Sequence, residues 1–328
     1  MKEVDIRPEA LLNRYLELSA EDAEQCFSGV PRQNLSCVAC GSAEVRHEFS
    51  KNGFSYATCK QCGTLYQTPR PKIEAFEAFY RDSVSSRYWA EQFFPAVAEA
   101  RREKILRPRA ERLIRMCETY GVKVDRLVDV GAGYGILLDE WRLLRPKTHL
   151  LAIEPSSSLA GECRAKGFEV VEDIAENVTS YRDYADLVVC FEVLEHVFDP
   201  LPFIKTLAGL ARPNGYVFVS TLSVDGYDIQ TLWEQSNSIF PPHHINFMSI
   251  EGFQHLFERA GLEVLSISTP GVLDVDIVRN AYRKNPENFI SNRFLRKLME
   301  SESQAAAFQE FLSSNCLSSH AWVFARKQ

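Results

Sequence analysis

Four of the nine cysteines form two closely spaced pairs, Cys37 with Cys40 and Cys59 with Cys62. In each pair two residues separate the cysteines and a glycine follows directly, so a tight turn can direct both sulfurs at one ion. Eighteen residues lie between the pairs, a spacing typical of a four-cysteine zinc site. Four thiolates leave no ligand position for water or substrate, so the pattern predicts a structural Zn²⁺ ion rather than a catalytic one. Two unrelated pairs of buried thiols, or a redox dithiol, are the alternatives.

A second segment that could bind a ligand reads LVDVGAGYG, a strand-like run that leads directly into a glycine-rich turn. Gly131, Gly133 and Gly135 allow the backbone to approach a ligand closely, and the following helix start offers free N–H groups to an anion. Glu154 ends the next expected strand and is placed to accept hydrogen bonds from two ribose hydroxyls. These features predict a nucleotide-type cofactor, although Ile136 stands where a dinucleotide-binding motif has its last glycine. An NAD-binding turn or an unliganded turn is the alternative.

Three histidines are candidates for moving a proton. His196 follows an expected strand, at the sheet edge where α/β folds bind ligands. His243 and His244 stand in the segment PPHHINF, where two prolines stiffen the backbone and adjacent side chains point in different directions if the segment is extended. We favour His244 as a general base, with a structural role as the alternative for each histidine. A metal site from His243 and His244 is not expected, because no acid stands next to them in the sequence.

The elements that must position these residues alternate between strand and helix from Arg126 onward, which predicts an α/β fold with a parallel sheet. The expected helices cover residues 135–145, 156–166, 200–212 and 249–260. The expected strands cover residues 126–131, 148–154, 168–172, 185–191, 215–222 and 262–268, and the closing segment HAWVFARK has the pattern of a last strand.

The first 120 residues are expected to be helical on either side of the cysteine segment. Residues 8–18 have a helical apolar pattern, and Ser19 with Asp22 could cap a second short helix. A helical region at 73–118 follows the cysteines, and within it residues 99–115 carry seven arginines and lysines against three glutamates. This basic stretch could hold an anionic part of a substrate, or it could be a solvated helix face.

Three aromatic residues lie just before the basic stretch. Tyr80, Tyr88 and Trp89 could form a lid over an acceptor pocket, although core packing is the simpler interpretation for each.

The glycine turn and its surroundings resemble the class I S-adenosylmethionine-dependent methyltransferases. The first motif of that family is an acid followed by G-x-G-x-G, here Asp129 and the three glycines, and an acid ends the second strand, here Glu154. The fourth strand of the family leads into a short motif that here reads FEVLEH, from Phe191 to His196, and LAGLARPNGYVFVSTL also matches. The resemblance covers residues 120–270 strongly and extends to the last strand.

The resemblance implies a Rossmann-like sheet of seven strands with an antiparallel C-terminal edge, and S-adenosyl-L-methionine as the cofactor. Asp129 and the glycines would line its methionine end, and Glu154 would hold its ribose. Asp173 or a neighbour would lie beside the adenine, although an exposed loop acid is nearly as good an interpretation. Phe191 and Glu192 would border the sulfonium.

The composition is that of an ordinary globular protein, with 45% hydrophobic and 25% charged residues. A formal net charge of −7 argues against a protein held to nucleic acid by bulk charge, and no apolar run reaches the roughly 18 residues of a membrane helix. The N-terminus has no apolar core of a signal peptide, so a cytoplasmic location is expected. We expect a helical arm at 1–30, a small zinc ribbon at 31–72 and a methyltransferase domain at 73–328 with an insertion at 270–318.

The leading functional hypothesis is methylation of a small molecule, most plausibly a sugar or a nucleotide-activated sugar with an anionic handle. A segment similar to PPHHINF occurs in sugar methyltransferases that carry an N-terminal four-cysteine module, where an acid–histidine pair precedes an aromatic stretch. Here His243 replaces the acid, and we expect no counterpart of the long C-terminal domain of those enzymes. An RNA methyltransferase that uses the ribbon for substrate binding, and a non-catalytic cofactor-binding scaffold, are the alternatives.

Overall fold

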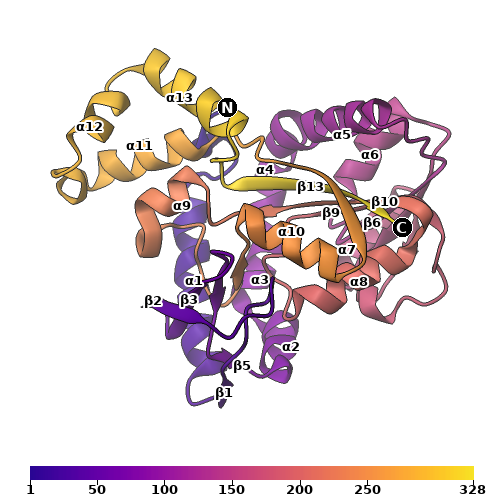
Figure 1. Ribbon diagram of the computed structural model, residues 1–328, viewed down its shortest axis with the longest axis horizontal. Coiled ribbons are helices and arrows are strands. Elements are labelled where there is room, and N and C mark those ends of the chain that lie inside the picture. The colour runs from indigo at the N-terminus through magenta and orange to yellow at the C-terminus, as the bar shows by residue number, and fades with distance from the viewer.

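The computed structural model describes residues 1–328 and is built around a seven-stranded sheet (Figure 1). The strand order is β12-β13-β10-β9-β6-β7-β8. Parallel pairing joins β6 (Arg126–Val130), β7 (His149–Ile153), β8 (Glu169–Val171), β9 (Ala185–Phe191) and β10 (Ala211–Leu222). The last strand, β13 (His320–Lys327), lies between β10 and β12 (Leu262–Ser268) and is antiparallel to both. The expected α/β methyltransferase sheet with an antiparallel edge is therefore confirmed.

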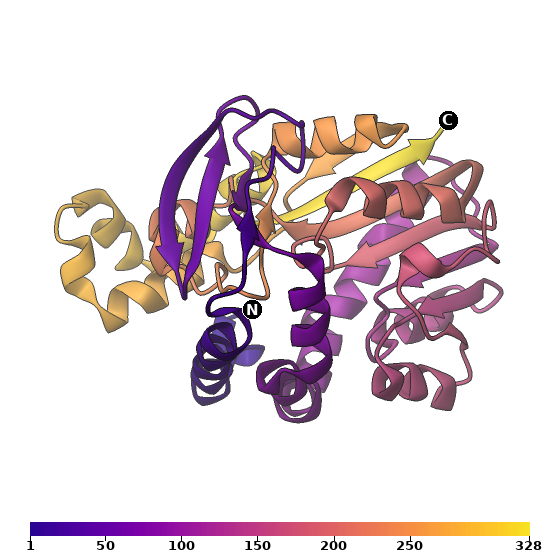
Figure 2. The same cartoon turned by 90° about the horizontal axis from the view of Figure 1, so that it is seen from below.

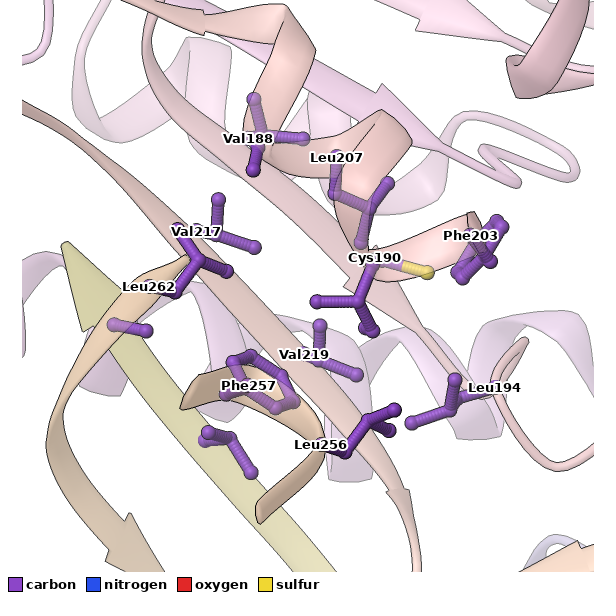
Figure 3. Close-up of a cluster of buried hydrophobic side chains, with 14 of the residues drawn as sticks. Val188, Cys190, Leu194, Phe203, Leu207, Val217, Val219, Leu256, Phe257 and Leu262 are labelled. Carbon is purple, nitrogen blue, oxygen red and sulfur yellow. The ribbon is translucent and has the colours of Figure 1, made fainter. Parts of the chain in front are cut away.

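Helices cover both faces of this sheet. Successive strand residues point to opposite faces, so one strand contributes side chains to both helical layers. Leu187 and Val189 of β9 contact the layer of α5 (Arg107–Thr119), α6 (Ile136–Leu144) and α7 (Ser157–Ala165). Val188 and Cys190 contact the opposite layer of α8 (Pro200–Leu210) and α10 (Ile250–Arg259). Figure 3 shows this second core, in which the apolar side chains of β9, β10, α8 and α10 interdigitate.

The N-terminal arm contains one long helix where two were expected. After a short 3₁₀ turn (Glu3–Asp5), α1 runs from Glu9 to Phe27 without a break. The hydroxyl of Ser19 donates to the carbonyl of Tyr15, 2.9 Å away, within the helix. The buried carboxylate of Asp22 accepts from the N–H groups of Val84 and Ser85, so it caps α3 (Val84–Tyr88) instead of a helix of its own. The predicted break at Ser19 is therefore wrong, because Ser19 bonds back within the helix and Asp22 is used in a tertiary contact.

The helical region after the cysteines consists of short pieces. α2 (Ile73–Asp82), α3 (Val84–Tyr88), α4 (Phe94–Arg101) and α5 follow one another, with π-helical turns at Trp89–Phe93 and Arg102–Leu106.

The cysteine segment forms a four-stranded sheet with the order β11-β4-β3-β2. Three strands come from the segment itself: β2 (Val45–Lys51), β3 (Phe54–Cys59) and β4 (Leu65–Gln67). The fourth, β11 (Asn246–Phe247), comes from the C-terminal half of the chain. A further small pair joins β1 (Arg32–Gln33) to β5 (Arg70–Pro71). The ribbon at 31–72 is thus completed by a strand from the methyltransferase part, and Figure 2 shows it beside the main sheet.

The expected insertion at 270–318 is helical. It contains α11 (Asp274–Lys284), a 3₁₀ turn (Pro286–Phe289), α12 (Arg293–Met299) and α13 (Glu302–Ser314), which project from one end of the molecule (Figure 1). These helices pack with α9 (Tyr227–Leu232) around a small apolar core of their own. None of the helices in the chain combines the length and the apolar character needed to cross a membrane.

Candidate functional site

The glycine turn adopts a backbone that other residues rarely tolerate. Gly131, Gly133 and Gly135 have φ angles of +76°, +55° and +67°. A Cβ atom at Gly131 would lie 2.5 Å from the Val193 side chain, and one at Gly135 would lie 3.0 Å from the sulfur of Cys163. A Cβ atom at Gly133 would meet nothing within 4 Å. The first and third glycines are therefore required for packing, whereas Gly133 faces open space in which a ligand could lie.

Two carboxyl groups converge on this turn from the ends of β6 and β7. Glu154 accepts hydrogen bonds from the N–H groups of Gly133 and Ser156, at 2.8 and 3.0 Å. Asp129 is 2% exposed, and burial together with the charge of Glu154 raises its pKa to about 8. Open space beside Gly133, a carboxylate able to accept from ribose hydroxyls and a second acid nearby fit the expected S-adenosylmethionine site.

Asp173 lies in the loop after β8 and is exposed. Its carboxylate accepts from the Ile174 N–H and from the Asn177 side-chain amide, both at 2.8 Å, beside a short 3₁₀ turn (Ala175–Asn177). No contact in the structure ties it to the glycine turn, and its placement beside an adenine stays a prediction.

Phe191 and Glu192 stand at the end of β9, and Glu192 has a φ angle of +56°, a strained conformation for a side chain of this type. Its carboxylate accepts from the Ser220 hydroxyl at 2.7 Å and pairs with Arg109 at 3.0 Å and with His320 at 3.3 Å. Burial opposes ionisation, but the charges of His320 and Arg109 outweigh it and hold the pKa of Glu192 well below its usual value. Glu192 is therefore a fixed negative charge where the resemblance places the sulfonium.

One turn further on, the fold brings together three side chains that are far apart in the sequence. Glu195, His196 and His244 each offer one oxygen or nitrogen atom, and these atoms lie within 4.8 Å of one another. Glu195 accepts from the Thr221 hydroxyl at 2.7 Å. The rings of His196 and His244 are 4.7 Å apart between centroids. We call these three residues the acceptor cluster.

The tautomer of His244 follows from its partner outside the cluster. Its Nδ1 lies 2.7 Å from the carbonyl oxygen of Ser238, which accepts and cannot donate, so Nδ1 carries the hydrogen. Nε2 of His244 is then a hydrogen-bond acceptor in the neutral ring. Burial lowers the pKa of His196 to about 4 and that of His244 well below its usual value, and it raises the pKa of Glu195 to about 8.

His243 points away from the acceptor cluster, as expected for adjacent side chains. Its Nε2 lies 2.9 Å from the Ser85 hydroxyl, and its ring packs against Phe79 and Tyr15 at 4.9 and 5.4 Å between centroids. Only His244 of this pair reaches the cluster. Glu195 was missed from the sequence as a site residue, although it stands in FEVLEH beside His196, because its distance from His244 is set by the fold alone.

An aromatic wall leads from the acceptor cluster to the glycine turn. Tyr80 places its hydroxyl 3.4 Å from Nδ1 of His196, and Phe240 packs on His244 at 4.1 Å between centroids. Further along, Trp89 contacts Tyr15, and Phe94 stacks at 4.6 Å on Tyr134 of the glycine turn. Tyr80 therefore borders the cluster, whereas Tyr88 and Trp89 belong to the buried packing around Tyr15.

The basic stretch at 99–115 is mostly neutralised within the protein. Its ion pairs join Arg102 and Arg107 to Glu140, Lys104 to Asp5, Arg109 to Glu192 and Arg115 to Glu111. Arg112 lies over the ring of Trp322. Arg101 has no acidic partner and lies over Trp89 and Phe94, at 5.7 and 5.5 Å from the ring centroids. Of the basic stretch, Arg101 is therefore the candidate that remains for binding an anion.

The four paired cysteines meet at one point, as expected. Sγ of Cys37 lies 3.6 Å from that of Cys62, Sγ of Cys40 lies 3.5 Å from that of Cys59, and all four are within 4.8 Å of one another. Sulfurs bound at about 2.3 Å to a tetrahedral zinc ion are about 3.8 Å apart, so this donor set fits Zn²⁺.

The cysteine sheet also holds the backbone on both sides of His244. The Tyr56 hydroxyl donates to the carbonyl of His244 at 2.6 Å, and the Gln67 N–H donates to that of Ile245 at 2.9 Å. Shortly after β11, the Ser249 hydroxyl donates to the carbonyl of Cys62. The sheet built by the cysteines is thus part of the framework of the acceptor cluster.

Comparison with known proteins gives matches over the same region. Residues 97–267, just over half of the chain, match the profile of the family described as methyltransferase domain. The ubiquinone biosynthesis O-methyltransferase of Aeromonas salmonicida (strain A449) is 32% identical over 110 residues, which are 31% of this chain and 45% of that protein. The enzyme of the same name from Xanthomonas campestris pv. campestris (strain B100) is 35% identical over 105 residues, 30% of this chain and 43% of that protein.

The chain spans less than half the length of these curated relatives. Among solved structures, an O-methyltransferase from a polyketide synthase of Brevibacillus brevis, bound to S-adenosylhomocysteine, aligns with a TM-score of 0.47 at 13% identity. That alignment covers 71% of this chain and 76% of the other.

Proposed function

This chain belongs to the methyltransferase-domain family, and from that premise we propose that it methylates a hydroxyl oxygen of a small molecule with S-adenosylmethionine. The observation that carries the proposal is the acceptor cluster, one turn away from Glu192 on the carboxyl side of the sheet. Partial similarity to proteins named O-methyltransferases supports oxygen as the methylated atom.

S-adenosylmethionine supplies a methyl group on a sulfonium, which is activated for direct displacement, so the protein mainly positions the acceptor and removes its proton. Glu154 and the turn around Gly133 hold the cofactor, with Asp129 behind the turn. The charge of Glu192 attracts the sulfonium to the end of β9.

The histidines of the acceptor cluster make the acceptor oxygen nucleophilic in this proposal. Where no other group occupies the cluster, Nε2 of His244 takes the hydroxyl proton, because its Nδ1–H is fixed on Ser238. The new oxygen–carbon bond forms as the carbon–sulfur bond breaks, and that electron pair stays on sulfur. His196 lies next to His244 and is the second histidine in contact with the acceptor, whereas His243 positions its neighbour.

A sugar or a nucleotide-activated sugar remains our proposal for the acceptor. The PPHHINF segment and the cysteine module support it, and Arg101 supplies a cation without an acidic partner for an anionic handle. The pairing of the other basic side chains in the 99–115 stretch gives no support to an RNA acceptor.

We also propose that the four cysteines bind a structural Zn²⁺ ion, supported by the distances between their sulfurs.

A cytoplasmic location accords with nine cysteines that form no disulfide.

The experiment is transfer of a labelled methyl group from S-adenosylmethionine to a panel of nucleotide sugars, free sugars, dihydroxyphenyl compounds and RNA. We expect label in a hydroxylated small molecule, matched by an equal amount of S-adenosylhomocysteine. Label in RNA alone would overturn the proposal of a small-molecule acceptor.

A further inference from the structure

We propose that Glu195, His196 and His244 bind a divalent cation on the acceptor side of the cofactor site. The inference rests on the proposed function and specifies how the acceptor cluster acts. It concerns a site separate from the four cysteines, with oxygen and nitrogen donors in place of sulfur.

The donor atoms of the three side chains lie close together. Nδ1 of His244 is bonded to Ser238, so Nε2 is the nitrogen of this ring whose lone pair is left for an ion shared with Glu195 and His196. A neutral His196 has one N–H hydrogen, so it can donate to Glu195 or to His244 but not to both. A cation between the donor atoms satisfies all three side chains at once.

Each of the three side chains also has a polar partner outside the cluster. Histidines that bind metals usually donate their other N–H to a carbonyl or carboxylate, and the bond from His244 to Ser238 is of this kind. Tyr80 lies 3.4 Å from Nδ1 of His196, and the Thr221 hydroxyl fixes one oxygen of Glu195 at 2.7 Å. These partners fix the directions of the donor atoms before any ion arrives.

The distances allow a single ion with little movement. Two ligands bound at about 2.1 Å to the same ion are at most about 4.2 Å apart. Around a tetrahedral ion the same ligands are about 3.4 Å apart, so donor atoms that lie within 4.8 Å of one another have to approach by about 1.4 Å at most. Such a shift is within the reach of small side-chain rotations.

The donor set indicates the class of ion. Two imidazoles and one carboxylate suit divalent transition-metal ions such as Mn²⁺, Fe²⁺, Co²⁺ and Zn²⁺, and three protein ligands leave positions free for further oxygen ligands. The acceptor hydroxyl takes one of these positions. Coordination lowers the pKa of that hydroxyl, and its proton leaves to solvent while His196 and His244 serve as ligands. The oxygen then bonds to the methyl carbon, and the electron pair of the broken bond remains on sulfur.

The direct test is a titration of the zinc-loaded protein with Mn²⁺ alone. Binding is measured by calorimetry and by the loss of the electron paramagnetic resonance signal of the free ion. Mn²⁺ prefers oxygen and nitrogen donors, so it leaves the four thiolates undisturbed. We expect one equivalent to bind, with affinity at least 10-fold weaker in Glu195→Gln, which keeps the size of the side chain. His149→Gln is the matched control, because His149 is exposed at the opposite, amino end of β7.

No Mn²⁺ binding up to millimolar concentration, or equal binding by Glu195→Gln, would overturn the inference. Methyl transfer at full rate in a chelator that leaves the cysteine-bound zinc in place would also overturn it, while leaving the proposed function intact. If the protein binds Mn²⁺ but transfers no methyl group, the cation site stands and the proposed function fails.

Discussion

Replacement of Gly133 by valine separates cofactor binding from folding. Gly133 has a φ angle of +55°, and a Cβ at this position would meet no protein atom within 4 Å, so an added side chain starts in the open space of the proposed cofactor site. A left-handed conformation costs a residue other than glycine roughly 1–2 kcal/mol. Gly121 is the matched control, with a φ angle of +66°, no atom within 4 Å of a Cβ, and a place in an exposed turn after α5.

Urea unfolding and calorimetric titration with S-adenosylmethionine measure the two effects. We expect Gly133→Val and Gly121→Val to lose similar unfolding free energy, about 1–2 kcal/mol each. Only Gly133→Val should lose affinity for S-adenosylmethionine, by at least about 100-fold, equivalent to roughly 2.7 kcal/mol. Unchanged affinity in Gly133→Val would refute the placement of the cofactor, and Gly133→Ala provides the same comparison if the valine variant does not fold.

Three further predictions concern the cysteines, the acceptor cluster and a buried acid. Cys59→Ser should lose stoichiometric zinc in metal analysis and slow methyl transfer, because the sheet that holds the backbone of His244 loses its metal; full zinc content would contradict the cluster. His244→Ala should bind S-adenosylmethionine normally but turn over at least about 100-fold more slowly, and full activity would remove His244 from the mechanism. Asp228 is wholly buried, and burial and the charge of Asp274 raise its pKa to about 8. Because the folded protein then holds this proton up to a higher pH than the unfolded chain, unfolding free energy should fall from about pH 4 to pH 8. Asp228→Asn should reduce that decline in urea titrations, and an unchanged pH profile would contradict the assignment.

The sheet was predictable from sequence because its strands are short apolar runs between polar or glycine-rich flanks. The expected limits of β9, β12 and β13 coincide with those in the structure. β10 begins four residues earlier than expected, since Ala211 already pairs with Ala185 ahead of the irregularity around Asn214. Local patterns set such elements almost completely.

What the sequence could not show depends on contacts between distant segments. No local pattern indicates that Asn246 pairs with Tyr66, so the cysteine segment looked like a separate module. Glu195 and His244 are 49 residues apart and share a site only because β9 and the PPHHINF segment meet at one edge of the sheet. The basic stretch looked suited to an anion because its acidic partner Glu140 lies on another helix.

The most direct test of the account is the fate of labelled S-adenosylmethionine mixed with the zinc-loaded protein and hydroxylated small molecules. We expect the methyl group to appear on an acceptor oxygen, with one S-adenosylhomocysteine formed for each methylated product. S-adenosylmethionine that binds but is never converted to S-adenosylhomocysteine, with any acceptor of the panel, would contradict it.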